Sequence, residues 1–220
     1  MGEHLLPILL FLFKKGNIPD YMLQNEVTQR YFHSEINTYL HSTNVTVHWY
    51  NRYKTLQAKE RHAGKAFKNY EMTKGILRFE VQLKDCQKKV KALLSEELCQ
   101  KRLWYFYDLI VGKGNHFTLE NAKQIIQSRV RSHVKKTALT RFIEFIDRCG
   151  SIWAARAQFP NQLEFRSGRQ STAQIMDIFS SRLRKLRELG VNPICLPFGL
   201  DIDRIDNLDS KIREYFERQM

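Results

Sequence analysis

The chain has 220 residues, a formal net charge of +13, a pI near 9.7 and 43% hydrophobic residues. This length suits one or two domains with a packed core, and the excess of Lys and Arg favours a polyanionic partner: nucleic acid first, an anionic membrane surface second. The composition argues against a zinc site, because the four cysteines are scattered without a CxxC pair. With no signal peptide, they are expected to be reduced cytosolic thiols.

Residues 1–44 carry the weakest signals. The apolar run from Leu5 to Phe13 is much shorter than the roughly 20 residues that span a bilayer, so it predicts a buried strand or helix and no membrane partner. Gly16 and Pro19 predict a break after it. Apolar residues at loose helical spacing predict a helix over residues 20–40.

Two later segments, VTVHWYNRYK (45–54) and GILRFEVQLK (75–84), alternate with the period of a β-strand. Paired side by side, they predict a sheet with an apolar back and a polar front that faces solvent. The polar front carries His48, Tyr50, Arg52, Arg78 and Glu80. We interpret this front as the remnant of an active surface for DNA chemistry.

The connection between these strands is basic and contains aromatic residues. Its cations include Lys59, Arg61, Lys65 and Lys68, and Phe67 and Tyr70 are interleaved with them. Cations and aromatic rings on one connection suit phosphate contact with base stacking. A solvated basic loop or short helix is the equally weighted alternative.

The remainder of the chain has helical spacing of apolar residues. Helices are expected over about 85–110, 118–130, 138–150, 172–189 and 207–220, with Thr118 as an N-cap and Gly150 as a C-cap. The helix over 172–189 has a basic exposed side, so it and the preceding helix could form a helix-turn-helix in a non-enzymatic DNA-binding regulator. Glycine-rich phosphate loops and a GxSxG motif are absent from the sequence.

These elements predict an α+β fold in which a small antiparallel sheet is backed by helices and followed by a mostly helical C-terminal region. Three parts are expected: an N-terminal segment (1–44), a partial nuclease-like sheet (45–84) and a helical region (85–220).

The order and spacing of three segments resemble the filamentous-phage gene II/gene X family of replication initiators, which includes phage and plasmid replication proteins. Tyr50 with Arg52 stands at the family's tyrosine motif, and Arg78-Phe79-Glu80 stands at its hydrophobic-Arg-Phe-Glu segment. A weaker likeness runs from FIEFIDRCGSIWAAR to LRKLRELGVNP, so the resemblance covers about three quarters of the chain.

The resemblance implies rolling-circle replication in the cytoplasm of a bacterial host cell. In the family, a tyrosine hydroxyl attacks a phosphodiester at the origin, forms a 5′-phosphotyrosine and frees a 3′-OH. A divalent metal, Mg²⁺ or Mn²⁺, held by a His-hydrophobic-His pair stabilises the charge on phosphate. The implied partners are origin, single-stranded or nicked DNA, and the host replication helicase and polymerase.

Several residues in and around the two motifs are candidates for a role in this chemistry. Tyr50 is the candidate nucleophile, with Tyr53 as the alternative because Lys54 follows it. His48 is a candidate base or ligand, and Glu80 is a candidate metal ligand or the ion-pair partner of Arg78. The expected DNA-binding cations are Arg52, Lys54, Lys59, Arg61, Lys65, Lys68 and Arg78.

The sequence departs from the family at the metal motif. No His-x-His occurs, and the domain half expected before Val45 is replaced by a short segment. The family includes a short product from the C-terminal part of the same reading frame that binds DNA without nicking. We therefore expect an N-terminally truncated or short form that binds DNA with incomplete nicking activity, and an active metal-dependent nicking and joining enzyme is the alternative.

Overall fold

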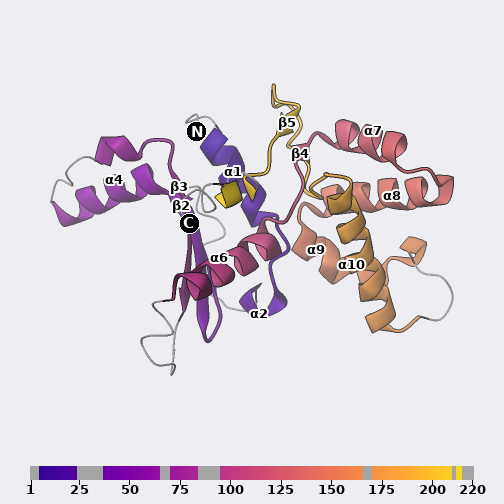
Figure 1. The fold of residues 1–220 in the computed structure, drawn as a ribbon, viewed down its shortest axis with the longest axis horizontal. Helices are drawn as coiled ribbons and strands as arrows, with labels where there is room; N and C mark the ends of the chain where they lie inside the picture. The colour runs from indigo at the N-terminus through magenta and orange to yellow at the C-terminus, as the bar shows by residue number, and fades with distance from the viewer. Residues whose placement is uncertain are drawn as a thin grey trace. The chain divides into compact units, whose positions relative to one another are not determined.

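The computed structural model describes residues 5–23, 37–64, 70–83, 95–165, 170–209 and 212–214. They fold into the predicted α+β architecture, with a three-stranded antiparallel sheet and a separate two-stranded one (Figure 1). The chain divides into two compact units: Met1–Lys14 with Ile18–Val111, and Lys15–Asn17 with Gly112–Met220.

The sheet of the first unit has the strand order β1-β2-β3, formed by Asn37–His41, Val45–Asn51 and Leu77–Leu83. Both predicted strands are present. β1 was not predicted, because residues 20–40 were expected to form one helix. Of that helix, the described part contains only α2 (Asp20–Leu23). The sheet register pairs Trp49 with Thr38 on one side and with Phe79 on the other.

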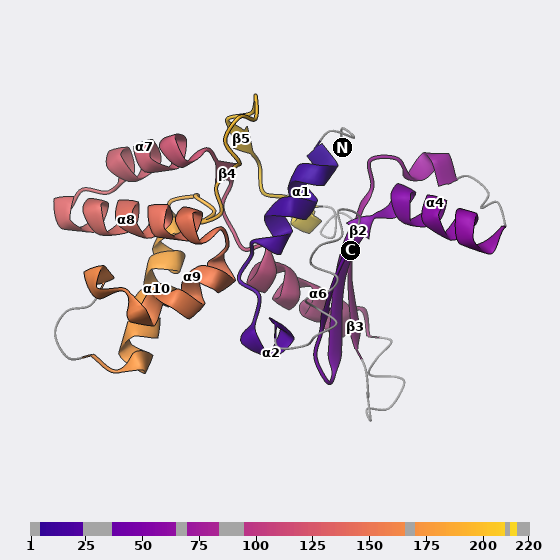
Figure 2. The ribbon, with the colours of Figure 1, turned by 180° about the vertical axis from the view of Figure 1, so that it is seen from behind.

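One face of the sheet is covered by two helices, α1 (Leu5–Lys14) and α6 (Glu96–Ile110), as both views show (Figure 1, Figure 2). Phe13 of α1 places its ring 6.3 Å from that of Trp49 and 6.4 Å from that of Phe79. Tyr107 of α6 lies 5.8 Å from Phe79. The predicted apolar back of the sheet is therefore the core of this unit, and the apolar run at the N-terminus is a helix.

The first predicted strand ends earlier than expected. Asn51 is the last residue of β2 and the N-cap of α4 (Arg52–Ala63), because its side-chain oxygen accepts a hydrogen bond from the backbone N–H of Lys54 at 3.1 Å. Arg52, Tyr53 and Lys54 are thus helical, so the prediction that the strand continues to residue 54, with Arg52 on its polar front, was wrong. A 3₁₀ turn, Tyr70–Thr73, precedes β3.

The second unit is built from helices: α7 (Leu119–Arg129), α8 (His133–Cys149), α9 (Ile152–Gln158) and α10 (Thr172–Glu188). Two 3₁₀ turns, Phe159–Asn161 and Leu163–Phe165, lie between α9 and α10. These elements lie between the two helices expected to form a helix-turn-helix, so that pairing was wrong. The three-residue joint lies instead between α7 and α8, which run side by side (Figure 1, Figure 2).

Phenylalanines form the centre of this helical unit. Phe142 of α8 lies 5.2 Å from Phe179 of α10 and 5.7 Å from Phe159, measured between ring centroids. The expected caps are confirmed: Thr118 accepts from the N–H of Asn121 at 3.3 Å, and Gly150 ends α8 with a φ of 77°. Most of the helix expected over 207–220 lies outside the described residues.

The second unit also contains a two-stranded antiparallel sheet. β4 (His116–Phe117) pairs with β5 (Arg204–Ile205). Asn207 fastens the turn before β4, because its side-chain amide donates to the carbonyl oxygens of Gly112 at 2.8 Å and Gly114 at 3.1 Å. Among the described residues, no helix is both apolar and long enough to cross a bilayer.

Candidate functional site

The polar face of the three-stranded sheet gathers the residues that the sequence singled out. Register places Tyr39, His48 and Glu80 in one row across the three strands and Tyr50 beside Arg78 in the next. Because directly opposed residues share a face of a sheet, these five side chains form one cluster. The predicted polar front therefore exists, apart from Arg52, which reaches it from α4.

Glu80 is the hub of the cluster. Its Oε1 accepts a hydrogen bond from the hydroxyl of Tyr50 at 2.9 Å and forms an ion pair with Nε of Arg78. Its Oε2 accepts from the side-chain amide of Gln82 at 3.4 Å and lies 3.8 Å from Nδ1 of His48. Both carboxylate oxygens of Glu80 therefore contact neighbouring side chains. This geometry supports the expected role of Glu80 as the ion-pair partner of Arg78.

Three rings stack along the same face. The centroid of Tyr39 lies 3.6 Å from that of His48, which lies 4.2 Å from that of Tyr50. His48 is 5% exposed, and this burial lowers its pKa to about 4, although the Glu80 carboxylate acts in the opposite direction. The imidazole is therefore neutral at pH 7. Among the described residues, its Nε2 has no hydrogen-bond partner.

Tyr50 lies on the predicted face but is covered. It is 4% exposed, whereas the sequence predicted a solvent-facing position. Burial raises the pKa of its hydroxyl, and the hydrogen bond to Glu80 adds to the effect. A guanidinium nitrogen of Arg52 lies 3.4 Å from the same oxygen and acts in the opposite direction. The phenol is consequently a neutral hydrogen-bond donor at pH 7 rather than a phenolate.

Tyr53, the alternative nucleophile, lies apart from this cluster. Its hydroxyl donates to Glu71 at 3.1 Å, and the ammonium group of Lys74 lies 5.3 Å from its ring centroid. These contacts tie α4 to the 3₁₀ turn before β3. Tyr53 therefore has a structural explanation that does not involve the sheet face.

Four of the predicted DNA-binding cations, Arg52 among them, are on α4. Lys54, Lys59 and Arg61 have exposed side chains on this helix, and among the described residues no acidic side chain pairs with them. Arg78, also exposed, is held by Glu80. Lys65 and Lys68 lie outside the described residues. The helix thus presents uncompensated positive charge directly after the strand that carries Tyr50.

The residues of the cluster do not fit a divalent metal. Only Glu80 and His48 offer ligand atoms of the expected kind, and within the described part of the chain no group of three or more His, Cys, Asp or Glu could hold an ion. The guanidinium groups of Arg78 and Arg52 stand beside the same carboxylate and phenol, and their charge opposes a dication. Glu80 is therefore assigned to the ion pair and not to metal binding.

Sequence reasoning missed Tyr39, which completes the ring stack. The segment NTYLH does alternate, because Thr38 and Leu40 are fully buried on the apolar face while Tyr39 and His41 lie on the polar one. This alternation was the available signal. His41 contributes at the edge of the same face, where its Nδ1 lies 2.9 Å from the hydroxyl of Thr46.

Comparison of the chain with protein-family models, with curated proteins and with solved structures found no match.

Proposed function

We propose that this protein is a DNA-binding replication protein of the rolling-circle initiator type that binds DNA without nicking it. The proposal joins the resemblance in the Tyr50 and Arg78-Phe79-Glu80 motifs to the charge of the chain. A net charge of +13 favours a polyanion, and the phosphate backbone is the part of DNA that such charge contacts.

The exposed cations of α4 are the observation that carries the proposal. Lys54 and Arg61 lie on the side of the helix opposite the buried Leu56, and the side chain of Lys59 is exposed as well, so their charge is available to solvent. Because α4 begins where β2 ends, its first turn adjoins the sheet, and Arg52 in that turn reaches the Tyr50 hydroxyl. A DNA strand bound along α4 would reach Arg78 at the edge of the polar face of the sheet.

The state of Tyr50 supports binding rather than cleavage. A nucleophilic hydroxyl needs a base to accept its proton or an environment that lowers its pKa. Here burial raises that pKa, and the hydroxyl is engaged by Glu80, whose charge is shared with Arg78. Neutral His48 is packed against the ring of Tyr50 rather than placed at its oxygen.

The proposed partners follow from the same role. Single-stranded or nicked origin DNA would be the ligand, and the host replication helicase and polymerase would act on the same DNA. A protein with this role works in the cytoplasm of the bacterial host cell.

The experiment is a binding titration of the full chain with labelled single-stranded and double-stranded DNA over a range of NaCl concentrations. Lys54→Glu and Arg61→Glu should each weaken binding about tenfold, and loss of a phosphate contact should reduce the salt slope by about 0.7 on single strands. Glu60→Gln on the same helix is the matched control and should bind no more weakly than the parent. Unchanged affinity in both charge-reversed variants would exclude α4 as the DNA-binding element.

Nicking and joining of DNA is the second candidate. The observation that favours it is Arg52, whose guanidinium lies 3.4 Å from the Tyr50 hydroxyl and could neutralise a phosphate placed there. Labelled DNA incubated with Mg²⁺ or Mn²⁺ would form a covalent protein–DNA adduct that Tyr50→Phe abolishes. The primary proposal expects no adduct under conditions in which binding is saturated.

A further inference from the structure

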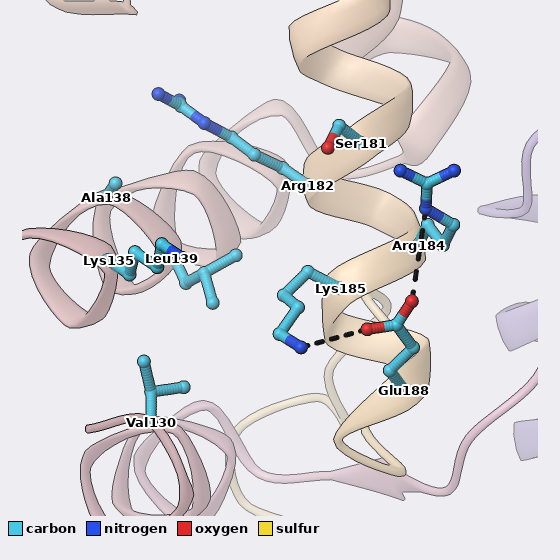
Figure 3. A pocket seen from close by; sticks show the side chains of 9 residues that line it. All are labelled: Val130, Lys135, Ala138, Leu139, Ser181, Arg182, Arg184, Lys185 and Glu188. Atoms are coloured by element: carbon cyan, nitrogen blue, oxygen red, sulfur yellow. Dashed lines mark hydrogen bonds and ion pairs between the residues drawn. The ribbon is translucent and has the colours of Figure 1, made fainter. Parts of the chain in front are cut away.

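The second unit contains a groove between the first half of α8 and the second half of α10 (Figure 3). Its volume is about 330 Å³, within the range of roughly 300–1,000 Å³ that is common for small-ligand sites. Val130, Ala138 and Leu139 provide its apolar surface. The side chains of Val130 and Leu139 are buried, so this surface belongs to the fixed core of the unit.

The rest of the lining is mainly cationic. Lys135 comes from α8, and Lys185 comes from α10, with its ammonium group turned toward Glu188, as Figure 3 shows. Glu188 is the one carboxylate among the lining residues, and it holds Nζ of Lys185 at 2.9 Å and Nε of Arg184 at 3.9 Å. Within the described part of the chain, Lys135 pairs with no acidic side chain. The groove therefore has an excess of positive charge.

A further cation is fixed in place beside the groove. The guanidinium of Arg182 lies 4.9 Å from the ring centroid of Phe165 and within 6 Å of those of Phe142 and Phe159. These cation–π contacts anchor the side chain against the aromatic core. Arg182 thus contributes a positive charge whose position is determined by the fold.

We propose that this groove binds one nucleotide unit of an unpaired nucleic acid strand. The phosphodiester would lie between Lys135 and Lys185, and the sugar and base edge would lie on Val130 and Leu139. An unpaired nucleotide can place both its phosphate and its base in such a groove, whereas in a duplex the bases are stacked and paired and present only their edges in the grooves.

The surroundings favour a strand over a free nucleotide. Arg131 is exposed in the turn that leads into α8, so positive charge continues beyond the groove. A strand can use this additional cation through its next phosphate, and a mononucleotide cannot. The inference adds a second nucleic-acid-binding surface to the proposed function, and it does not depend on the cations of α4.

The test measures the affinity of the full chain for fluorescein-labelled oligo(dT) by anisotropy over a range of salt concentrations. Lys135→Glu changes the charge of the groove, and Ser181→Trp fills it from the exposed side of α10 without changing charge. Lys113→Glu makes the same charge change at an exposed position outside the groove. Ser180→Trp places the same bulk on the adjacent exposed residue of α10. Circular dichroism confirms the folding of each variant.

We expect Lys135→Glu and Ser181→Trp each to weaken oligo(dT) binding about tenfold, and Lys135→Glu also to lower the salt slope by about 0.7 for the lost contact. The two controls should remain close to the parent. Equal losses with Lys113→Glu and Lys135→Glu, together with no effect of Ser181→Trp, would overturn the proposal in favour of general charge attraction.

Three further measurements distinguish a single strand from a duplex and from a small anion in the groove, and distinguish the groove proposal from the proposed function of α4. A hairpin duplex should be bound equally well before and after Ser181→Trp, and an equal loss there would overturn the single-strand assignment. Inorganic phosphate and dTMP are added as competitors of oligo(dT). If Lys135→Glu and Ser181→Trp changed only the inhibition by these anions and not the affinity for oligo(dT), the groove would be a small-anion site and the proposal of a bound strand would be overturned. Lys54→Glu on α4 reports on the proposed function alone, so a null result there leaves the groove result intact.

Discussion

The hydroxyl of Tyr50 donates a hydrogen bond to Glu80 at 2.9 Å, from the middle strand of the sheet to its edge strand. The bond joins a residue of the tyrosine motif to a residue of the Arg-Phe-Glu motif. Arg78 pairs with the same carboxylate, so Tyr50, Arg78 and Glu80 form one hydrogen-bonded group across β2 and β3. The hydroxyl of Tyr50 therefore has a structural role, and its contribution to the free energy of unfolding can be measured.

Removing the hydroxyl should therefore affect stability more than DNA binding. We expect Tyr50→Phe to lower the free energy of unfolding by about 1 kcal/mol, because one hydrogen bond is lost while Glu80 keeps Arg78. Urea unfolding measures the loss, and the oligonucleotide titration should give an unchanged dissociation constant. The control is Tyr53→Phe, whose exposed hydroxyl bond to Glu71 should contribute less. Strongly weakened binding by Tyr50→Phe would contradict a purely structural hydroxyl.

Asn51 joins strand to helix, which leads to a second prediction. Asn51→Ala removes the side-chain oxygen that accepts from the N–H of Lys54 and should lower the free energy of unfolding by about 1 kcal/mol. Asn51→Asp keeps an acceptor at the same place and should recover most of the loss. Because α4 carries the exposed cations, Asn51→Ala should also weaken DNA binding slightly. Equal stability of the two variants would show that the cap contributes nothing.

The sequence predicted the sheet in part because its alternation was clear where side chains meet a core. Val47 and Trp49 are fully buried, and the alternate residues His48 and Glu80 lie on the opposite face, as expected. The alternation also continued past the true end of β2, through Arg52 and Tyr53, where the helix begins. Asn51 was the signal for that end, because Asn is among the strongest N-cap residues.

The period of the strands did not predict that His48 and Tyr50 on the polar face would be buried. Alternation assigns a side chain to a face, but it does not tell whether neighbouring strands cover it. His48 and Tyr50 are covered because β2 is the central strand and because the ring of Tyr39 stacks on that of His48. Because β1 was predicted as part of a helix, this cover was missed, although the alternation in NTYLH was a signal for the strand.

His116 gives a prediction about pH. It is 2% exposed, and burial lowers its pKa from 6.5 to about 4, although its hydrogen bond with the carbonyl oxygen of Ile194 at 2.9 Å opposes the shift. Between these pH values the unfolded chain binds more protons than the folded one, so stability falls as pH decreases. The contribution is complete above pH 6.5 and is lost toward pH 4, with a total of about 3 kcal/mol.

His116→Gln should reduce this acid-side slope of the free energy of unfolding, measured by urea titrations at several pH values, and the buried His48, whose pKa is also lowered to about 4, should keep part of it. His133→Gln makes the same substitution at an exposed position at the start of α8 and is the matched control. An identical slope in parent and His116→Gln would mean that the imidazole is not buried in its neutral form.

Gly114 lies where two backbone segments of the second unit touch, and it gives the most position-specific prediction. Its φ is +89°, and a Cβ there would lie 2.6 Å from the carbonyl carbon of Val191 and 2.7 Å from the backbone nitrogen of Asn192. Gly114→Ala combines an unfavourable φ with a clash against backbone, so we expect a loss of about 3 kcal/mol or more in the free energy of unfolding. Gly199→Ala has a similar φ of +86° but meets no atom within 4 Å, so it should cost only about 1 kcal/mol. Because the two variants share the φ penalty, the difference in their urea midpoints isolates the close approach of the two segments, and equal midpoints would contradict it.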